Sequence, residues 1–340
     1  MDDAIRAAVA GDEAYVVGGA VRDELLGRPV LDVDVACREP ERAARAYRHA
    51  AGGAVFLLSE RHGAWRVALV AGRTVDFTLL QGTIEQDLAG RDFTINAIAV
   101  PVGAGDPIDP QGGRADLVAR RLRAVSDHAF ADDPLRLLRA VRLEDELGVR
   151  LEPGTEELVR RDAGLVARPA GERILAELLR LSARGYRRLG ELGLLAGLGG
   201  STERLDRLPP DASPELLLAA ALGASAERLP ISNETRRFAR MLLAASRPRD
   251  ASAREIHRFR RATEPWAFEA LALLGAAELA PAVTLARESE PAEPLLRGDE
   301  LGVPPGPEVG RLLELIAEER AAGTIRTRQE ALELVHRERR

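Results

Sequence analysis

The sequence contains no lysine, a single cysteine and few aromatic residues. All 48 basic residues are therefore arginines, which are suited to bidentate contacts with phosphate groups. The lone Cys37 excludes an intramolecular disulfide framework and a cysteine-rich zinc site, and it suits a reducing cytoplasm. Aromatic residues make up 4% of the chain, which disfavours binding of single-stranded nucleic acid mainly through base stacking.

Long apolar runs are also missing. No segment approaches the roughly 20 apolar residues that a membrane-spanning helix needs, and the first 30 residues do not resemble a signal peptide. We therefore predict a cytoplasmic protein with no membrane partner. The net charge of −6 argues against a uniformly basic surface for nucleic acid. The five histidines show neither a His-Asp pair in that order nor the close spacing of metal ligands, which disfavours a metal-dependent phosphohydrolase.

The length of 340 residues predicts two or more domains. The most informative segment lies near the start, where a predicted buried strand over 14–17 runs into Gly18-Gly19 and a predicted helix over 20–26. Such a junction allows the backbone to approach an anion closely. Alone, it is also typical of a purely structural turn.

Alternating aspartates follow this junction. In Leu31-Asp32-Val33-Asp34-Val35 the period of two places Asp32 and Asp34 on one strand face. Adjacent carboxylates repel each other unless a cation or solvent compensates, so the pair indicates either a divalent metal site or a solvated strand face. A later predicted strand over 74–79 carries Asp76 between Val75 and Phe77. Three carboxylates on neighbouring strands would support two-metal phosphoryl transfer.

Two further segments carry polar residues at helical spacing. The first holds Arg91, Asp92 and Asn96 in a helix or loop-helix over 87–99. In the second, Asp133 and Pro134 open a helix on which three arginines recur every third residue: Arg136, Arg139 and Arg142. We expect the last strand at 122–125, and almost only helices from residue 131 onward.

Together these motifs resemble the class II tRNA nucleotidyltransferases, the CCA-adding enzymes, and their bacterial poly(A) polymerase relatives. The motifs that carry the resemblance are, in order, Gly18 to Asp23, Asp32-Val33-Asp34, Arg91 to Ala97, Asp133 to Ala140, Glu172-Arg173-Ile174, and the Gly298-to-Gly310 segment. The resemblance implies an α+β chain with a polymerase-β-like head, then an all-α neck, body and tail. The expected bounds are 1–125, 126–185, 186–290 and 291–340.

The resemblance also implies roles for single residues. Gly18, Gly19 and Arg22 would cradle a nucleoside triphosphate, and Asp32 and Asp34 would bind Mg²⁺, with Asp76 as a third catalytic carboxylate. The nucleotide-binding set would continue with Arg91, Asp92, Asn96, Asp133, Arg136, Arg139 and Arg142. Among these, Asp133 and Arg136 match the pair that acts as an amino-acid template for the incoming base. A carboxylate accepts from an exocyclic amino group and a guanidinium donates to ring acceptors.

The partners implied are the tRNA acceptor end and CTP, ATP or both. Two departures from the family pattern are Gly90 before Arg91, where paired arginines are usual, and Asp132 in place of a glutamate. Between Asp76 and Arg91 lie only 90 − 77 + 1 = 14 residues. The resemblance implies that CCA-adding relatives have a longer flexible loop here, which helps the pocket switch from cytosine to adenine. The short connection therefore predicts a CC-adding enzyme that works beside a separate A-adding one.

Two alternatives stay open. A bacterial poly(A) polymerase shares every head motif, although such enzymes often carry a basic C-terminal extension, and this chain ends soon after Arg337. A catalytically silent RNA-binding protein with the same fold would keep the architecture, but it would be expected to lose metal ligands first. The sequence predicts no oligomeric state and no individual tRNA contacts within 186–290.

Overall fold

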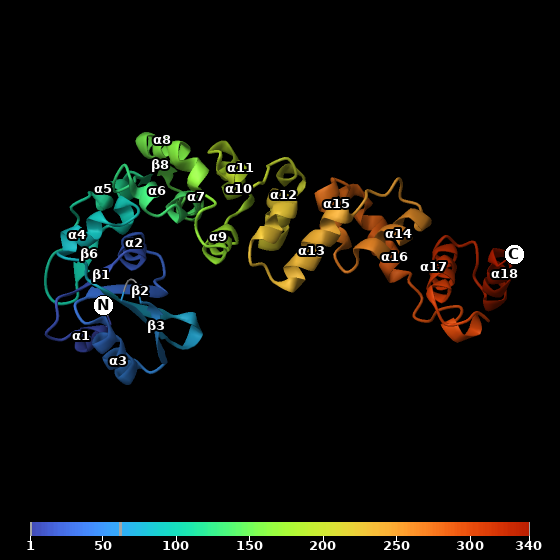
Figure 1. Ribbon diagram of the computed structural model, residues 1–340, viewed down its shortest axis with the longest axis horizontal. Helices are drawn as coiled ribbons and strands as arrows, with labels where there is room; N and C mark the ends of the chain where they lie inside the picture. Colours follow the sequence, from blue (N-terminus) through green and yellow to red (C-terminus); the bar gives the residue numbers. More distant parts are fainter. Residues whose placement is uncertain (1, 61–62, 340) are drawn as a thin grey trace. The chain divides into compact units, whose positions relative to one another are not determined.

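Strands and helices are unevenly distributed along the chain. The computed structural model describes residues 2–60 and 63–339 and divides into two units, residues 1–197 and 198–340. All eight strands described belong to the first unit, and the second unit is built from helices (Figure 1). The predicted α+β class is confirmed.

The first unit begins with a six-stranded sheet and its helices. The sheet has the order β3-β4-β5-β2-β1-β6. Its strands are β1 (Ala14–Val17), β2 (Asp32–Cys37), β3 (Ala54–Ser59), β4 (Ala64–Ala68), β5 (Thr74–Leu79) and β6 (Ala99–Pro101). The accompanying helices are α1 (Asp3–Ala8), α2 (Gly19–Leu25), α3 (Pro40–Ala51), α4 (Ile84–Ala89) and α5 (Gly113–Val118), with a 3₁₀ turn at Thr94–Asn96.

The register of the sheet brings the predicted carboxylates together. β2 and β5 are parallel, and Asp34 lies directly opposite Asp76. β4 runs antiparallel to β5 and places Arg66 opposite Asp76. The alternate residues Val35 and Phe77 are fully buried on the other face, where Phe77 packs against Tyr47 of α3. One face of the sheet is therefore apolar and covered by α3, which leaves the other face for the charged side chains.

Helix α4 closes the connection between β5 and Arg91. Its N-terminus is a capping box in which Thr83 accepts from the Gln86 backbone N–H, and the Gln86 side chain accepts from the Thr83 N–H. Leu80, Ile84 and Leu88 are buried in a cluster with Val17 and Ala36 of the central strands. The expected helix or loop-helix over 87–99 is thus divided: α4 ends at Ala89, and only the 3₁₀ turn follows.

Replacing Leu88 by alanine tests how firmly this connection is held. Leu88 is fully buried, so the change removes buried methylene groups and leaves a cavity, with an expected cost of about 2–5 kcal/mol in the free energy of unfolding. Urea denaturation followed by circular dichroism measures this. Val118→Ala is the control, because Val118 is 89% exposed and its loss is expected to change stability by less than about 0.5 kcal/mol. Equal effects of the two variants would contradict the packing described for α4.

The rest of the first unit is mainly helical. Its helices are α6 (Ala129–Asp132), α7 (Leu135–Leu147), α8 (Pro153–Asp162), α9 (Gly171–Leu178), α10 (Ala183–Glu191) and α11 (Leu194–Gly197). The expectation that strands end at 122–125 is wrong. β7 (Arg121–Leu122) pairs in parallel with β8 (Arg150–Leu151), a two-residue strand too short to show a period-two pattern in the sequence.

The second unit consists of helices joined by turns and loops, including a loop over 289–306 before its last two helices. They are α12 (Pro214–Leu222), α13 (Asn233–Ala244), α14 (Ala253–Thr263), α15 (Ala267–Leu274), α16 (Ala280–Glu288), α17 (Pro307–Ala321) and α18 (Arg328–Glu338). The last two helices share a core with the preceding loop, in which Leu296, Leu312 and Leu334 are buried. Within the described residues, no helix combines the length and the apolar character that crossing a membrane requires.

Candidate active site

Asp32, Asp34 and Asp76, called the acidic group below, lie on one face of β2 and β5 but differ in their partners. Asp32 accepts a hydrogen bond from the Thr74 hydroxyl at 2.8 Å. Both Asp76 oxygens accept from Arg66, from Nε and from Nη2, each at 2.7 Å. Burial raises the pKa of Asp34 above its ordinary value. The Asp76 and Asp32 carboxylates act in the same direction, while Arg91 and Arg66 oppose them. Negative charge is therefore concentrated around Asp34.

The Gly18-Gly19 turn lies against this acidic group. Gly18 has φ +73°, and a Cβ built there would lie 3.1 Å from Arg91 Nη1 and 3.2 Å from Asp34 Oδ2. The backbone conformation therefore favours glycine, and the close approach leaves little room for a side chain. A Cβ at Gly19 would lie 3.5 Å from Arg22 Nη2, so the Arg22 guanidinium folds back over this turn. The structure thus brings Gly18, Gly19, Arg22 and Arg91 together beside Asp34.

A chain of hydrogen bonds extends from this turn to α7. Arg22 pairs with Asp23 and donates from Nη1 to Asn96 Oδ1 at 2.8 Å. Asn96 donates to Asp92 Oδ1 at 3.0 Å. Asp92 Oδ2 accepts from Arg139 Nε at 2.9 Å and Nη2 at 2.6 Å. Four residues predicted to bind nucleotide are thus joined into one network.

Asp92 is the buried carboxylate of this network. It is 7% exposed. Burial acts to raise its pKa, but Arg139, Asn96 and the Phe93 backbone N–H outweigh that effect and hold the pKa below the ordinary value. Asp92 is therefore an ionised carboxylate held in place by its neighbours. Arg91 is fixed separately, because its Nε and Nη2 donate to Asp87 of α4 at 3.2 and 2.9 Å.

The pair predicted to read the base lies at the start of α7. Asp133 accepts from Arg173 Nη2 at 2.8 Å and from the Leu135 N–H at 3.2 Å. Burial acts to raise the pKa of Asp133, but Arg173 and the Leu135 N–H lower it overall. Arg136 donates from Nη2 to the Gly90 carbonyl at 2.6 Å and from Nη1 to the Ala129 carbonyl at 3.3 Å.

Arg142 is set apart from the other predicted residues. It is 5% exposed, and its guanidinium pairs with Glu146 on the same helix and with Glu177 of α9. Because these carboxylates lie on α7 and α9, the geometry of Arg142 suits stabilisation of α7 against α9. We accordingly expect Arg142 to support Arg139, which lies 3.7 Å from the other oxygen of Glu177, without contacting a nucleotide itself.

Comparison with known proteins places these residues in a family. Residues 14–123 match the profile of the poly A polymerase head domain. A protein of Geobacter sulfurreducens named CC-adding tRNA nucleotidyltransferase is 35% identical over 390 aligned positions, which cover 94% of this chain and 91% of the relative. This chain belongs to the class II CCA-adding family of tRNA nucleotidyltransferases.

Other members differ in the activity that their names state. An A-adding tRNA nucleotidyltransferase of Deinococcus radiodurans is 45% identical across 54% of this chain and 44% of its own length. The crystal structure of the Bacillus stearothermophilus CCA-adding enzyme in complex with CTP superposes with a TM-score of 0.71 and 27% identity, covering all of this chain and 98% of that one. The family is therefore clear, whereas similarity alone does not distinguish CC, A and CCA addition.

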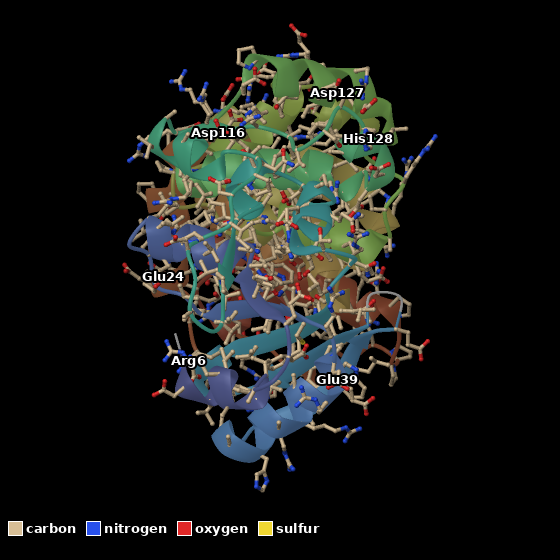
Figure 2. All side chains as sticks on the ribbon, turned by 90° about the vertical axis from the view of Figure 1, so that its left-hand side faces the viewer. Arg6, Glu24, Glu39, Asp116, Asp127 and His128 are labelled. Atoms are coloured by element: carbon tan, nitrogen blue, oxygen red, sulfur yellow. The ribbon has the colours of Figure 1, made fainter. Side chains whose placement is uncertain are left out.

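As a member of this family, the chain is expected to use a divalent metal, and the donor set fits one. Asp32 and Asp34 offer carboxylate oxygens, and Mg²⁺ in phosphoryl-transfer sites is held by one or two carboxylates together with substrate phosphates. Within residues 2–60 and 63–339, no three side chains of Asp, Glu, His or Cys form a group that could hold a metal. The expected third carboxylate, Asp76, instead accepts from Arg66 with both of its oxygens. His128, the N-cap residue of α6, is exposed beside Asp127 (Figure 2).

Several residues that form hydrogen bonds or ion pairs with the predicted site residues were not predicted to do so. They are Arg66, Thr74, Asp87, Arg173 and Glu177. Arg66 offered a signal, because it stands between Trp65 and Val67 just as Asp76 stands between Val75 and Phe77. Charged residues of opposite sign at such positions on neighbouring strands predict a pair, provided that the register is known.

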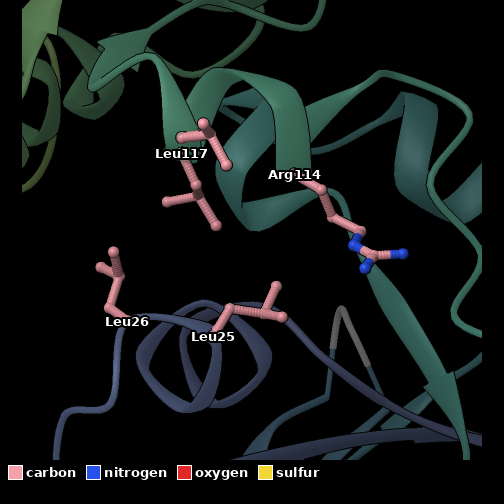
Figure 3. Close-up of a pocket in the computed structure, with 5 residues that line it drawn as sticks. Leu25, Leu26, Arg114 and Leu117 are labelled. Carbon is pink, nitrogen blue, oxygen red and sulfur yellow. The ribbon is translucent and has the colours of Figure 1, made fainter.

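An apolar depression of the first unit lies away from these residues. Its volume is about 250 Å³, and its lining includes Leu25, Leu26, Leu117 and Val118, with Arg114 at its side (Figure 3). It faces the end of α2 opposite to the Gly18-Gly19 turn. The acidic group and its arginines, rather than this depression, carry the groups needed for phosphoryl transfer.

Proposed function

We propose that this protein is a template-independent nucleotidyltransferase of the cytoplasm that adds cytidines to the 3′ end of tRNA. The observation that carries the proposal is that Asp34 and Arg91 lie against Gly18, with Arg22 folded over Gly19 and Asp32 on the same strand face as Asp34. In the reaction, the RNA 3′ oxygen forms a bond to the α-phosphorus of CTP. The bond from that phosphorus to the oxygen of the departing pyrophosphate breaks, and the hydroxyl proton passes to solvent.

Each group has a defined part in this proposal. Arg22 and Arg91 hold the triphosphate above the glycine turn, where their guanidinium groups balance its charge. Asp32 and Asp34 would hold Mg²⁺, which when bound supplies charge neutralisation at the phosphates and favours ionisation of the attacking hydroxyl. Asp92 and Asn96 keep Arg22 oriented. The residues of 1–125 would act as the head and 126–185 as the base-recognising neck, with 186–290 and 291–340 as the tRNA-binding body and tail.

Base choice is proposed to lie with Asp133 and Arg136. Cytosine carries an amino donor beside a ring nitrogen and a carbonyl. Asp133 can accept from that amino group, while Arg136 donates to the neighbouring acceptors. Uracil lacks the amino group, so it would leave the Asp133 carboxylate without a donor, which disfavours UTP.

The connection through α4 favours CC addition. It is capped by Thr83, it packs through Leu88, and the Gly90 carbonyl at its end accepts from Arg136. Adding adenine to the same pocket requires the template residues to reposition around a larger base. Because Arg136 is tied to a short, packed segment, we infer one fixed arrangement and expect a separate enzyme to add the terminal A.

The function is tested with tRNA transcripts that end at the discriminator base, at one C and at two Cs, each offered CTP or ATP alone. We expect C to be added to the first two substrates until two are present, and no A on any of them. Addition of a terminal A would contradict CC specificity while keeping the family function. Long A tails on unrelated RNA would instead favour a poly(A) polymerase. The Asp32→Asn variant serves as the inactive control.

A further inference from the structure

Arg66 lies at the acidic group without a part in the reaction described so far. It stands on β4 opposite Asp76, and its Nε and Nη2 each donate to one Asp76 oxygen at 2.7 Å. Asp76 in turn lies opposite Asp34 on the neighbouring strand. Arg66 therefore points to the same face of the sheet as the proposed metal ligands.

The guanidinium of Arg66 is only partly used by this pair. Its side chain is 34% exposed, while that of Asp76 is 11% exposed. A guanidinium has five N–H donors, and Asp76 takes two of them. In the described part of the chain, Asp76 is the one residue that accepts a hydrogen bond from the Arg66 guanidinium. A fixed cation with free donors is thus exposed to solvent at the edge of the site.

The order of the strands defines which substrate can reach it. Gly18, Gly19 and Arg22, which are proposed to bind the triphosphate, follow β1. Arg66 lies on β4, beyond β5 in the sheet, so Asp32 and Asp34 on β2 lie between the two. In-line displacement places the attacking oxygen and the leaving pyrophosphate on opposite sides of the phosphorus. The RNA end must then approach from the side of β5 and β4, where Arg66 lies.

Charge gives a reason for a cation at this place. An RNA end brings its last phosphodiester close to Asp32, Asp34 and Asp76, which repel it. Arg66 offsets that repulsion, because its hydrogen bonds to Asp76 and the nearby Asp32 and Asp34 carboxylates raise its pKa above the ordinary arginine value. Arg66 is thus always charged.

We propose that Arg66, oriented by Asp76, binds the terminal phosphodiester of the acceptor RNA and aligns the 3′ hydroxyl for attack. The proposal rests on the proposed function, since it names the side from which that substrate enters. Asp76 then serves as the anchor of a phosphate-binding arginine.

The test combines a protein variant with a modified RNA. Arg66→Gln is compared with wild type on tRNA primers whose last phosphodiester is either natural or a neutral methylphosphonate. A hydrogen bond to a charged group contributes about 1.5–3 kcal/mol, so we expect Arg66→Gln to raise the KM for the natural primer about 10- to 100-fold. On the neutral primer, wild type and Arg66→Gln should differ by less than about threefold. The KM for CTP should stay within about twofold of wild type.

Arg73→Gln is the matched control, because Arg73 is an exposed arginine just before β5; it should behave as wild type on both primers. Arg66→Lys keeps the positive charge and provides a second variant if Arg66→Gln lowers the melting temperature of the protein. Equal losses on natural and neutral primers would overturn the proposal and leave Arg66 as a structural partner of Asp76. Wild-type protein that binds natural and neutral primers differently, but extends neither, would count against the proposed function and not against the phosphate contact.

Discussion

Asparagine in place of Asp34 is expected to reduce nucleotide addition by on the order of 10³-fold, and Asp32→Asn by a similar factor. Each change keeps the shape of the side chain and removes a charged oxygen from the proposed metal position. Single-turnover extension of a tRNA that ends at the discriminator base measures the loss. Mn²⁺ binding, followed by electron paramagnetic resonance in the absence of RNA, should weaken in parallel.

The melting temperature of Asp34→Asn distinguishes a loss of catalysis from a loss of folding. Burial and two neighbouring carboxylates disfavour a charge on Asp34, so the neutral Asp34→Asn side chain should leave the melting temperature unchanged or raise it. Asp106→Asn is the control, because Asp106 is exposed in the loop after β6 and should retain full activity. If Asp34→Asn extended tRNA at more than about a tenth of the wild-type rate, the assignment of the acidic group as the reaction centre would be wrong.

The alternation of residues along individual β-strands was sufficient to predict part of this site. The alternation around Asp32 and Asp34 placed both on one face, and the acid between Val75 and Phe77 predicted that Asp76 would join them. Their partners depend on strand register, which no local pattern reveals. Arg66 reaches Asp76 only because β4 and β5 pair as they do, and the same holds for Thr74 and Asp32.

The arginines of α7 show the same limit on a helix. Arg136, Arg139 and Arg142 recur every third residue, but a helix turns about 100° per residue, so each is rotated about 60° from the one before. The three arginines therefore reach three different surroundings. Arg136 contacts the Gly90 carbonyl, Arg139 contacts Asp92, and Arg142 is buried with Glu177. Tertiary packing, and not spacing, decides which of them can meet a nucleotide.

Breaking the Asp92–Arg139 pair is expected to cost more than any surface ion pair. Arg139→Gln would leave the buried Asp92 without its cation, which typically costs about 3–5 kcal/mol. Asp92→Asn should cost less, because the Arg139 side chain is 33% exposed and keeps Glu177 at 3.7 Å. Urea denaturation measures both. Arg6→Gln, which breaks a solvent-exposed pair with Asp3, is the control and should cost less than about 1 kcal/mol.

The pair also predicts how stability depends on pH. Because the pKa of Asp92 is lowered in the folded state, its contribution is fully present above the unfolded value of about 3.9 and is lost as the pH falls toward the folded value. Wild type should therefore lose free energy of unfolding below about pH 4 more steeply than Asp92→Asn. Identical slopes would show that the ionised Asp92 carboxylate does not stabilise the fold. Because Asp92 holds Asn96, and Asn96 holds Arg22, the variant should also raise the KM for CTP at neutral pH, where the fold persists. An unchanged KM would mean that the network stabilises the head without orienting the arginine that is proposed to bind the triphosphate.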